Sequence, residues 1–330
     1  MSARRALVTG ATGGLGLSLC AALSGAGYWV RATGRNQANA ARVRCAEFVR
    51  ADLLTADLVT LCADVDVVFH AAALSSPWGP RAAFEAVNVD ATQRLLAAAR
   101  AAGAGGFIFV SSPSIYAALR DQPLLTEDSP LPRRALNAYA LTKRKAEDLV
   151  RAADTPSFRT VSMRPRALIG PDDTVLMPRI LAFAARGWFP ALRGGQALIE
   201  LTDVRDAAAA LMLADQNLAQ AGGGAINISG GHPMRVAALV EELAAALKRP
   251  IALRPVPIQL ALALARGGEI VCGALPTRPE PRLTTYGVAT LAYTQTFDLT
   301  RARNVLGYKP ARDAIATAQG LAARSIGLSR

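Results

Sequence analysis

The fold follows from the segment Ala6-Leu7-Val8-Thr9-Gly10-Ala11-Thr12-Gly13-Gly14-Leu15-Gly16. A short apolar run, typical of a buried strand, leads into a glycine-rich turn, after which Leu15, Leu19 and Leu23 recur at helical spacing. This order predicts a dinucleotide site, because a turn without side chains lets a pyrophosphate approach the backbone and the helix directs free N–H groups at it. A glycine turn without a ligand is the alternative, and the flanking strand and helix disfavour it.

The composition is that of a large globular protein. The chain has 330 residues, of which 52% are hydrophobic, enough for one large domain or two. Its net charge is +12, but the basic residues form no run and no stripe interleaved with aromatic residues, so we expect no nucleic-acid partner. The positive charge can still help to attract an anionic ligand. Four scattered cysteines without a C-x-x-C pair, and only two histidines, predict no metal site and no disulfide framework.

We expect a cytoplasmic protein. The first predicted strand starts at Ala6, which leaves no room for a signal peptide after Met1. The most apolar late stretch, residues 258–275, is interrupted by Arg266-Gly267-Gly268-Glu269, so we predict no membrane span there.

The end of the second strand, Tyr28 to Thr33, bears on the choice of cofactor. A site specific for NAD(H) usually has an acidic residue there, which accepts hydrogen bonds from the ribose hydroxyls. This chain has Gly34 and then Arg35. An acid would repel a 2′-phosphate, whereas an arginine would bind it with charge-assisted hydrogen bonds. We therefore predict NADP(H) in preference to NAD(H), with a surface arginine at a turn as the alternative.

Two further strands should end at the same edge of the sheet. Residues 48–53 form a strand and its exit, and Val65 to His70 form the next strand, which is followed by Ala71-Ala72-Ala73. Ligands of open α/β sheets bind at this edge, so Trp78 in the following loop is a candidate substrate contact. We expect His70 to be packed or hydrogen-bonded rather than catalytic, because no carboxylate lies near it in the sequence.

A pair of residues with catalytic chemistry follows the fifth strand. That strand, residues 107–112, ends on Ser111 and Ser112, and a helix predicted over residues 136–151 carries Tyr139 and Lys143 on one face. Tyrosine is a poor base at its ordinary pKa of about 10, but a neighbouring ammonium and an oxidised nicotinamide would favour the phenolate. In the reducing direction the phenol would give its proton to a carbonyl oxygen as hydride reaches the carbon.

The remaining chain predicts a second, smaller region. Val161 to Pro165 is the sixth strand, and after it the alternation of strands and helices weakens. We predict a helix from Met177 to Trp188 and a strand from Leu198 to Thr202. The predicted fold class is α/β, a Rossmann-type doubly wound parallel sheet with a smaller C-terminal α/β substrate domain. Residues 1–165 would bind the cofactor, residues 198–229 would return to that domain, and residues 166–197 and 230–330 would bind the substrate.

The order of glycine turn, strand-end serine and Tyr-x-x-x-Lys helix resembles the extended short-chain dehydrogenases/reductases, within the NAD-dependent epimerase/dehydratase superfamily. The narrower resemblance is to the 3β-hydroxysteroid dehydrogenase and 2-alkyl-3-oxoalkanoate reductase-like group. It rests on Pro281-Arg282-Leu283-Thr284, on Phe297-Asp298 and on Ala73-Leu74-Ser75-Ser76-Pro77-Trp78-Gly79. It implies a hydride transfer between NADP(H) and a ketone or secondary alcohol of a small hydrophobic substrate.

The resemblance also implies roles for individual residues. The catalytic residues would be Ser112, Tyr139 and Lys143, with Ser111 as the other candidate serine. Cofactor contacts would come from Gly10, Thr12, Gly13, Gly14, Leu15, Gly16, Arg35, Asp52, Leu53, Ala71, Ala72, Ala73, Tyr139, Lys143, Arg164 and Pro165. Substrate contacts would come from Trp78, Ser111 and Met177.

Two alternatives remain open. One is a nucleotide-sugar epimerase or dehydratase on the same fold. Such enzymes commonly place an arginine near the sugar-nucleotide phosphates where this chain has Ile199, which cannot bind a phosphate. The other is a non-catalytic dinucleotide sensor, although such relatives typically lose the tyrosine or the lysine. A homodimer formed through the Tyr139 helix is possible, and the identity of the substrate and the direction of the reaction stay open.

Overall fold

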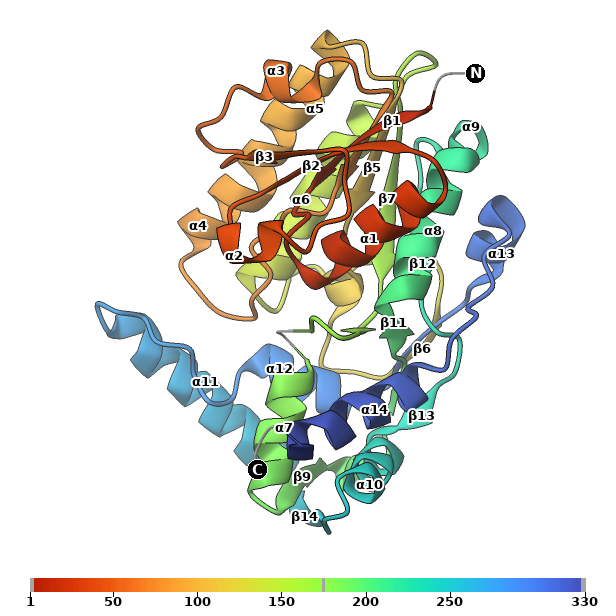
Figure 1. The fold of residues 1–330 in the computed structure, drawn as a ribbon. Coiled ribbons are helices and arrows are strands. Elements are labelled where there is room, and N and C mark those ends of the chain that lie inside the picture. Colours follow the sequence, from red (N-terminus) through yellow and green to blue (C-terminus); the bar gives the residue numbers. More distant parts are fainter. Residues whose placement is uncertain (1–2, 174–175, 328–330) are drawn as a thin grey trace.

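A seven-stranded parallel sheet forms the centre of the structure, a computed structural model that describes residues 3–173 and 176–327 (Figure 1). The strand order is β12-β7-β5-β4-β1-β2-β3. The strands are β1 Arg5–Thr9, β2 Trp29–Gly34, β3 Glu47–Arg50, β4 Val67–His70, β5 Gly106–Val110, β7 Arg159–Pro165 and β12 Ala225–Ile228. The chain runs outward from β1 to β3, returns beside β1 as β4 and continues to the other edge. The predicted doubly wound parallel sheet is confirmed, and its order reverses between β1 and β4.

Helices cover both faces of this sheet. On one face α1, Gly14–Gly25, packs against α8, Val204–Gln216, through residues such as Leu23 and Leu211. The other face is covered by α3 Leu58–Cys62, α5 Ala91–Ala101 and α6 Ala138–Ala152. Burial on both faces explains why β1, β4 and β5 are nearly continuous apolar runs.

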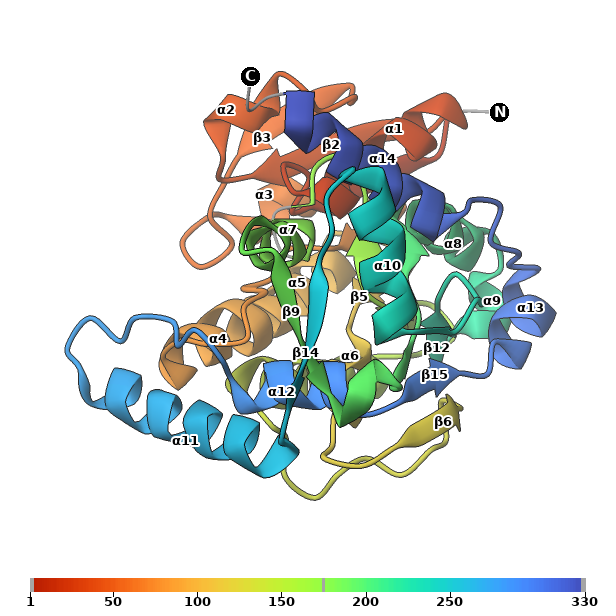
Figure 2. The ribbon, with the colours of Figure 1, turned by 90° about the horizontal axis from the view of Figure 1, so that it is seen from below.

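A smaller group of elements lies beyond the carboxyl ends of the strands (Figure 2). It comprises α7 Met177–Ala185, β9 Trp188–Leu192, α10 Val236–Ala246, β14 Ala252–Val256, α11 Ile258–Ala274, α12 Thr285–Ala292 and α14 Ala314–Gly327. Strands β9 and β14 pair in parallel, and α7, α10 and α14 share a core that includes Leu239, Leu243 and Ala318. Helix α11 packs on α12 through Ala261 and Ala265 and otherwise projects from the molecule.

Short elements complete the connections. They are α2 Gln37–Ala40, α4 Arg81–Glu85, a π-helical turn at Ala86–Asp90, a 3₁₀ turn at Pro113–Tyr116, β6 Gln122–Leu125, β8 Leu168–Ile169, a 3₁₀ turn at Arg193–Gly195, α9 Leu218–Ala221, β13 Met234–Arg235, β15 Gln295–Phe297 and α13 Thr300–Leu306.

Two predictions for the segment that follows β7 were wrong. The helix expected to reach Trp188 ends at Ala185, because Gly187 adopts φ +72° and Trp188 begins strand β9. The strand expected from Leu198 to Thr202 is divided into β10, Leu198–Ile199, and β11, Thr202–Asp203. These two short strands pair with different partners, β13 and β8.

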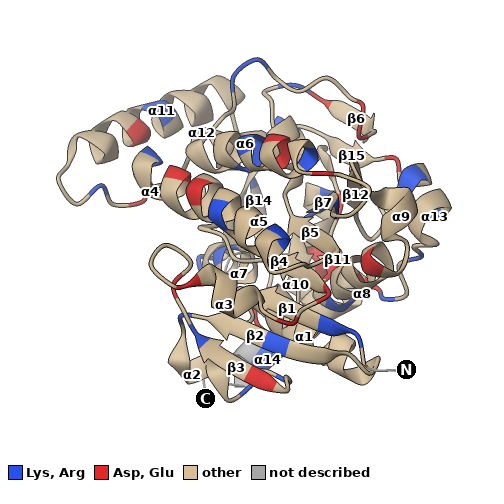
Figure 3. Cartoon of the chain, turned by 90° about the horizontal axis from the view of Figure 1, so that it is seen from above, with Lys and Arg blue, Asp and Glu red and all other residues tan. Residues whose placement is uncertain are grey.

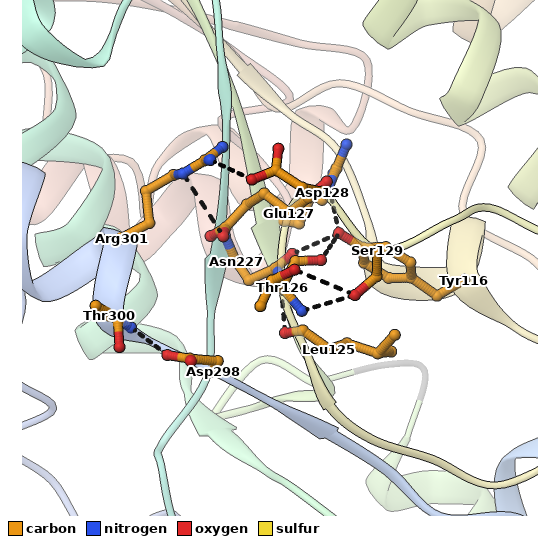
Figure 4. A network of polar contacts seen from close by, with 11 residues as sticks. Tyr116, Leu125, Thr126, Glu127, Asp128, Ser129, Asn227, Asp298, Thr300 and Arg301 are labelled. Atoms are coloured by element: carbon orange, nitrogen blue, oxygen red, sulfur yellow. Dashed lines mark hydrogen bonds and ion pairs between the residues drawn. The ribbon is translucent and has the colours of Figure 1, made fainter.

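A polar network joins the late segment β15–α13 to the central sheet (Figure 4). Glu127 accepts a hydrogen bond of 2.8 Å from the backbone N–H of Asn227 in β12, and its carboxylate lies 3.7 Å from the Arg301 guanidinium. Arg301 also pairs with Asp128 at 2.7 Å. Tyr116 donates to the Thr126 carbonyl oxygen at 3.2 Å, and so connects the network to the strand exits.

The surface carries charges of both signs. Figure 3 shows both basic and acidic positions along α6, and the sequence of that helix includes Arg144, Lys145 and Arg151 as well as Asp148. Among the helices of the described ranges, none combines the length and apolarity that crossing a bilayer requires.

Candidate active site

One cavity of about 1310 Å³ joins the carboxyl ends of the sheet strands to the smaller region. It lies beside the β1–β4 reversal, the place where open α/β sheets bind ligands. Most of the predicted site residues line it: Gly10, Thr12, Gly13, Gly14, Leu15, Gly16, Arg35, Asp52, Leu53, Ala71, Ala72, Ala73, Ser111, Ser112, Tyr139, Lys143 and Pro165. The structure therefore brings together residues that are more than 150 positions apart in the sequence.

The glycine turn has the shape that a pyrophosphate requires. Gly10 adopts φ +68°, and a Cβ atom there would lie 2.7 Å from the backbone nitrogen of Ala72. A Cβ atom on Gly16 would overlap the carbonyl oxygen of Gly10. Only glycine fits at these two positions, which keeps the backbone at the start of α1 open to a ligand. The turn therefore fits a dinucleotide on its own geometry.

Arg35 lies at the rim of the cavity, directly after β2. Its guanidinium is 65% exposed and lies 3.7 Å from the carboxylate of Asp52, another lining residue. A Cβ atom on Gly34 would lie 2.6 Å from the Thr12 hydroxyl oxygen, so no side chain could extend from that position without displacing Thr12. The first charged side chain after the strand is thus a largely exposed arginine at the cavity rim.

Tyr139 is placed by the first turn of α6. The Asn137 side chain caps this helix by accepting a hydrogen bond of 2.8 Å from the backbone N–H of Ala140. The hydroxyls of Ser75 and Ser112 lie close enough to the Tyr139 hydroxyl to influence its pKa. Burial raises the pKa of Tyr139, and the two serine hydroxyls oppose part of that rise. In the absence of cofactor the phenol therefore holds its proton firmly.

The two candidate serines differ in their surroundings. Ser112 contacts Tyr139 and accepts a hydrogen bond of 3.2 Å from the backbone N–H of Ser114, so its oxygen is fixed in place. The hydroxyl of Ser111 is buried without a hydrogen-bond partner among the described residues. This geometry favours Ser112 as the residue that orients a carbonyl oxygen beside Tyr139.

Lys143 lies one turn after Tyr139 and is 2% exposed. Its ammonium donates a hydrogen bond of 2.7 Å to the Val110 carbonyl oxygen and lies 4.5 Å from the centre of the Phe109 ring. Burial lowers the pKa of Lys143 to about 7, with the charge of Glu147 opposing the shift. The side chain thus enters the site as a cation that is held in a poorly solvated place.

His70 is a structural residue, as expected from the sequence. It lies between two threonine hydroxyls, with Nδ1 2.8 Å from Thr9 and Nε2 2.9 Å from Thr92. Thr92 donates to the Asn88 carbonyl oxygen, so its oxygen accepts from His70 Nε2–H, and Nδ1 accepts from Thr9. Burial and the Lys143 charge lower the pKa of His70 to about 3, so the ring stays neutral at physiological pH.

Asn88 lies in the π-helical turn between α4 and α5 and connects two walls of the site. Its side chain accepts from the Leu74 N–H at 2.8 Å and donates to the Leu74 carbonyl oxygen at 3.2 Å. It also lies 3.1 Å from the hydroxyl of Thr142, next to Lys143. The local widening of the helix lets one buried amide hold both the loop after β4 and helix α6.

Three predicted residues do not line the cavity. Trp78 lies against α11 and donates a hydrogen bond of 3.2 Å from its indole N–H to the Arg278 carbonyl oxygen. Met177 is buried in the core shared by α7 and α10. Arg164 forms a two-pronged ion pair with Glu147, at 2.8 and 2.6 Å, and donates to the Tyr116 hydroxyl. Its backbone continues into Pro165, which does line the cavity.

Several polar lining residues escaped the sequence analysis, among them Ser75, Arg166, Glu200 and Tyr286. Arg166 is 7% exposed and follows the Arg164-Pro165 pair directly. A charged residue at the exit of an apolar strand was a signal that the sequence offered. Tyr286, in α12, could not be recognised as a site residue before the chain was folded, because the sequence around it carries no motif of its own.

Comparison with known proteins identifies related chains. Residues 6–229 match the NAD dependent epimerase/dehydratase family. An uncharacterised protein of Escherichia coli K12, YbjS, is 35% identical, with 93% of each chain covered. A 2-alkyl-3-oxoalkanoate reductase of Stenotrophomonas maltophilia K279a is 33% identical over 92% of this chain and 94% of its own. A decarboxylating sterol-4-alpha-carboxylate 3-dehydrogenase of Mus musculus is 26% identical over 93% of this chain and 87% of its own.

A solved structure resembles the whole chain. MoeE5, determined in complex with UDP-glucuronic acid and NAD, superposes with a TM-score of 0.75 at 26% identity, covering 97% of this chain and 99% of its own.

Proposed function

The chain belongs to the NAD-dependent epimerase/dehydratase family and is an NAD(P)-dependent oxidoreductase of the extended short-chain type. We propose that it transfers hydride between NADP(H) and a ketone or secondary alcohol of a hydrophobic substrate. The observation that carries the proposal is the contact of the Tyr139 hydroxyl with Ser112, one helical turn before the buried Lys143, inside a largely apolar cavity. These three groups have the chemistry that carbonyl reduction requires.

Each group has one task in the proposed reaction. The nicotinamide supplies or accepts the hydride. The Ser112 hydroxyl donates a hydrogen bond to the carbonyl oxygen and holds it beside Tyr139. The Tyr139 phenol gives its proton to that oxygen during reduction and takes it back, as the phenolate, during oxidation. The Lys143 cation favours the phenolate and can reach the nicotinamide ribose. Its hydrogen bond to the Val110 carbonyl oxygen holds the ammonium at the end of β5.

The preference for NADP(H) rests on the end of β2. No acidic residue stands there to hold a free ribose, and Arg35 is a solvated cation at the cavity rim. A 2′-phosphate would gain a charge-assisted hydrogen bond from Arg35, whereas a 2′-hydroxyl would gain little.

The proposed substrate class follows from the cavity wall and from the relatives. Ile199 lines the cavity where a sugar-nucleotide enzyme commonly has an arginine for its phosphates. This favours hydride transfer on an apolar substrate over the nucleotide-sugar epimerase alternative. The names of the Stenotrophomonas maltophilia and Mus musculus relatives describe substrates that share one feature, a carboxylate one carbon away from the carbon that carries the reacting oxygen. A cytoplasmic location and a homodimer remain predictions.

The experiment that tests the function is NADPH consumption, followed by absorbance, with a 2-alkyl-3-oxo acid and a 3-ketosteroid offered side by side. Turnover of either substrate would support the proposed reaction and would rank the two shapes. If neither is reduced while NADPH still binds, the reductase proposal fails and the epimerase and sensor alternatives return.

A further inference from the structure

The guanidinium of Arg166 is a buried cation without a partner. It makes no hydrogen bond or ion pair with any residue that the structure describes, and its Nε is fully enclosed. The backbone on either side is fixed: its N–H donates to the Ile228 carbonyl oxygen at 2.8 Å, and its own carbonyl oxygen accepts from the Thr202 hydroxyl. The side chain is therefore held in place by its backbone and not by an anion.

An arrangement of this kind is costly unless something completes it. A buried charge is normally paired, because the lost hydration is otherwise not replaced. Glu200 is the nearest acidic candidate, but no ion pair forms between the two. Its oxygens instead accept hydrogen bonds from the Ser229 hydroxyl and from the Phe297 N–H. Burial raises the pKa of Glu200, and the charge of Arg166 opposes only part of that rise, so Glu200 is a weak counterion.

Arg166 faces the same cavity as the reactive phenol. It lines the cavity together with Tyr139 and Tyr286, and Tyr286 is close enough to interact electrostatically with each of the other two. The lining also includes apolar residues such as Ile199 and Leu291, and polar ones such as Ser75 and Glu200. A ligand that fills this space therefore meets a buried cation, two phenols and a largely hydrocarbon wall.

We infer that Arg166 binds the carboxylate of the substrate, so that the enzyme selects 3-oxo or 3-hydroxy carboxylic acids with an apolar chain over neutral ketones and alcohols. This inference rests on the proposed function and narrows its substrate class. The planar guanidinium can donate two parallel hydrogen bonds to a carboxylate, and low solvation strengthens both. The carboxylate would fix one end of the substrate while Ser112 and Tyr139 hold its oxygen.

Neighbouring residues support the positioning of Arg166. Arg164, two positions earlier, is locked to Glu147 and Tyr116, which anchors the exit of β7. An arginine held in this way loses little conformational freedom on binding, so its hydrogen bonds contribute more of their strength to affinity.

The test compares a charged substrate with its neutral counterpart. A long-chain 2-alkyl-3-hydroxy acid and its methyl ester are each oxidised with NADP⁺ by the wild-type enzyme and by Arg166→Gln and Arg166→Lys. We expect Arg166→Gln to raise KM for the acid about 100-fold. Its effect on the ester should stay within about threefold, and Arg166→Lys should recover part of the affinity for the acid.

The matched control is Arg179→Gln. Arg179 also lines the cavity, but it is half exposed and already pairs with Glu280 at 2.8 Å, so the acid and the ester should be affected alike. Calorimetric binding of the hydroxy acid to each protein with NADP⁺ present supplies a readout that does not need turnover.

Failures of the two proposals can be told apart. If the wild type oxidises both compounds and Arg166→Gln impairs the acid and the ester equally, the inference about Arg166 is overturned while the reductase function stands. If the wild type oxidises neither, the function fails, and equal calorimetric affinities of wild type and Arg166→Gln for the acid overturn the inference as well. If Arg166→Gln weakens the binding of UDP-glucuronic acid but not that of the hydroxy acid, the inference is overturned and Arg166 belongs to a nucleotide-sugar site.

Discussion

Replacing Lys143 by methionine should stabilise the cofactor-free protein most at low pH. The folded state lowers the pKa of Lys143 from 10.5 to about 7, because the ammonium is buried. The unfolded chain therefore binds more protons than the folded chain between pH 7 and 10.5, and wild-type stability rises with pH across that window. At 1.36 kcal/mol per pKa unit, the penalty is about 5 kcal/mol below pH 7 and about 2 kcal/mol at pH 9.

The measurement is urea unfolding of the cofactor-free wild type and Lys143→Met at pH 6.5 and pH 9. Methionine keeps the length of the side chain but loses the hydrogen bond to Val110, worth about 1–3 kcal/mol at any pH. The free energy of unfolding of the wild type relative to the variant should rise by about 2.5 kcal/mol between the two pH values. Comparing the difference between two proteins cancels the other groups that titrate.

Lys145→Met on the same helix is the matched control. Its ammonium is 43% exposed and pairs with Glu85 at 2.7 Å, so the variant should follow the pH dependence of the wild type. A flat difference between wild type and Lys143→Met would refute the reasoning, because it would mean that the buried ammonium is as well stabilised as one in water.

Three further outcomes are expected. Tyr139→Phe should lower kcat by about a thousandfold while NADPH affinity, measured by fluorescence titration, changes little, and loss of cofactor binding instead would show that the tyrosine is not the acid. Arg35→Ala should weaken NADPH binding about tenfold and leave NADH binding nearly unchanged, since the charge-assisted bond to the 2′-phosphate is lost; equal effects on both would contradict the 2′-phosphate contact. Gly16→Ala should lower the free energy of unfolding by about 2 kcal/mol or more and abolish cofactor binding, because its Cβ meets backbone atoms of Gly10 and Ala11. Gly25→Ala is the control: it lies at the end of the same helix, where a Cβ meets nothing within 4 Å, and it should be neutral.

The parts of the site that were predictable from sequence depend on local geometry. A glycine turn between a strand and a helix has the same shape wherever it occurs, so Gly10 and Gly16 could be placed without knowing the rest of the fold. Tyr139 and Lys143 share a helix face by spacing alone. The position of Ser112 required only that parallel strands end at one edge of a sheet.

The parts that were not predictable depend on contacts between distant segments. Strand β9 forms only because β14, more than 60 residues later, pairs with it, and Gly187 separates it from the preceding helix. Local periodicity therefore extended that helix to Trp188. Arg164 resembles a cofactor contact by motif, but its charge is taken by Glu147. The nearness of Tyr286 to Arg166 similarly depends on how α12 packs against α11 and β9 in the smaller region.

Burial shifts the pKa values of the ionisable groups in this site so that the neutral form of each is favoured. Burial raises the pKa of Tyr139 and lowers the pKa values of Lys143, His70 and Arg166, so the cofactor-free site disfavours the charged form of each group. Arg166 keeps its charge nevertheless, because a guanidinium is effectively always protonated. A protonated phenol is the form that can give a proton to the carbonyl oxygen when hydride arrives from the cofactor, and a cation without an ion-pair partner attracts a carboxylate. In the cofactor-free protein Tyr139 is therefore protonated, and the Arg166 guanidinium has no ion-pair partner among the residues that the structure describes. A substrate that has a carboxylate one carbon away from its ketone would use both groups. Its carboxylate would pair with the Arg166 guanidinium on binding, and its ketone oxygen would take the Tyr139 proton during reduction.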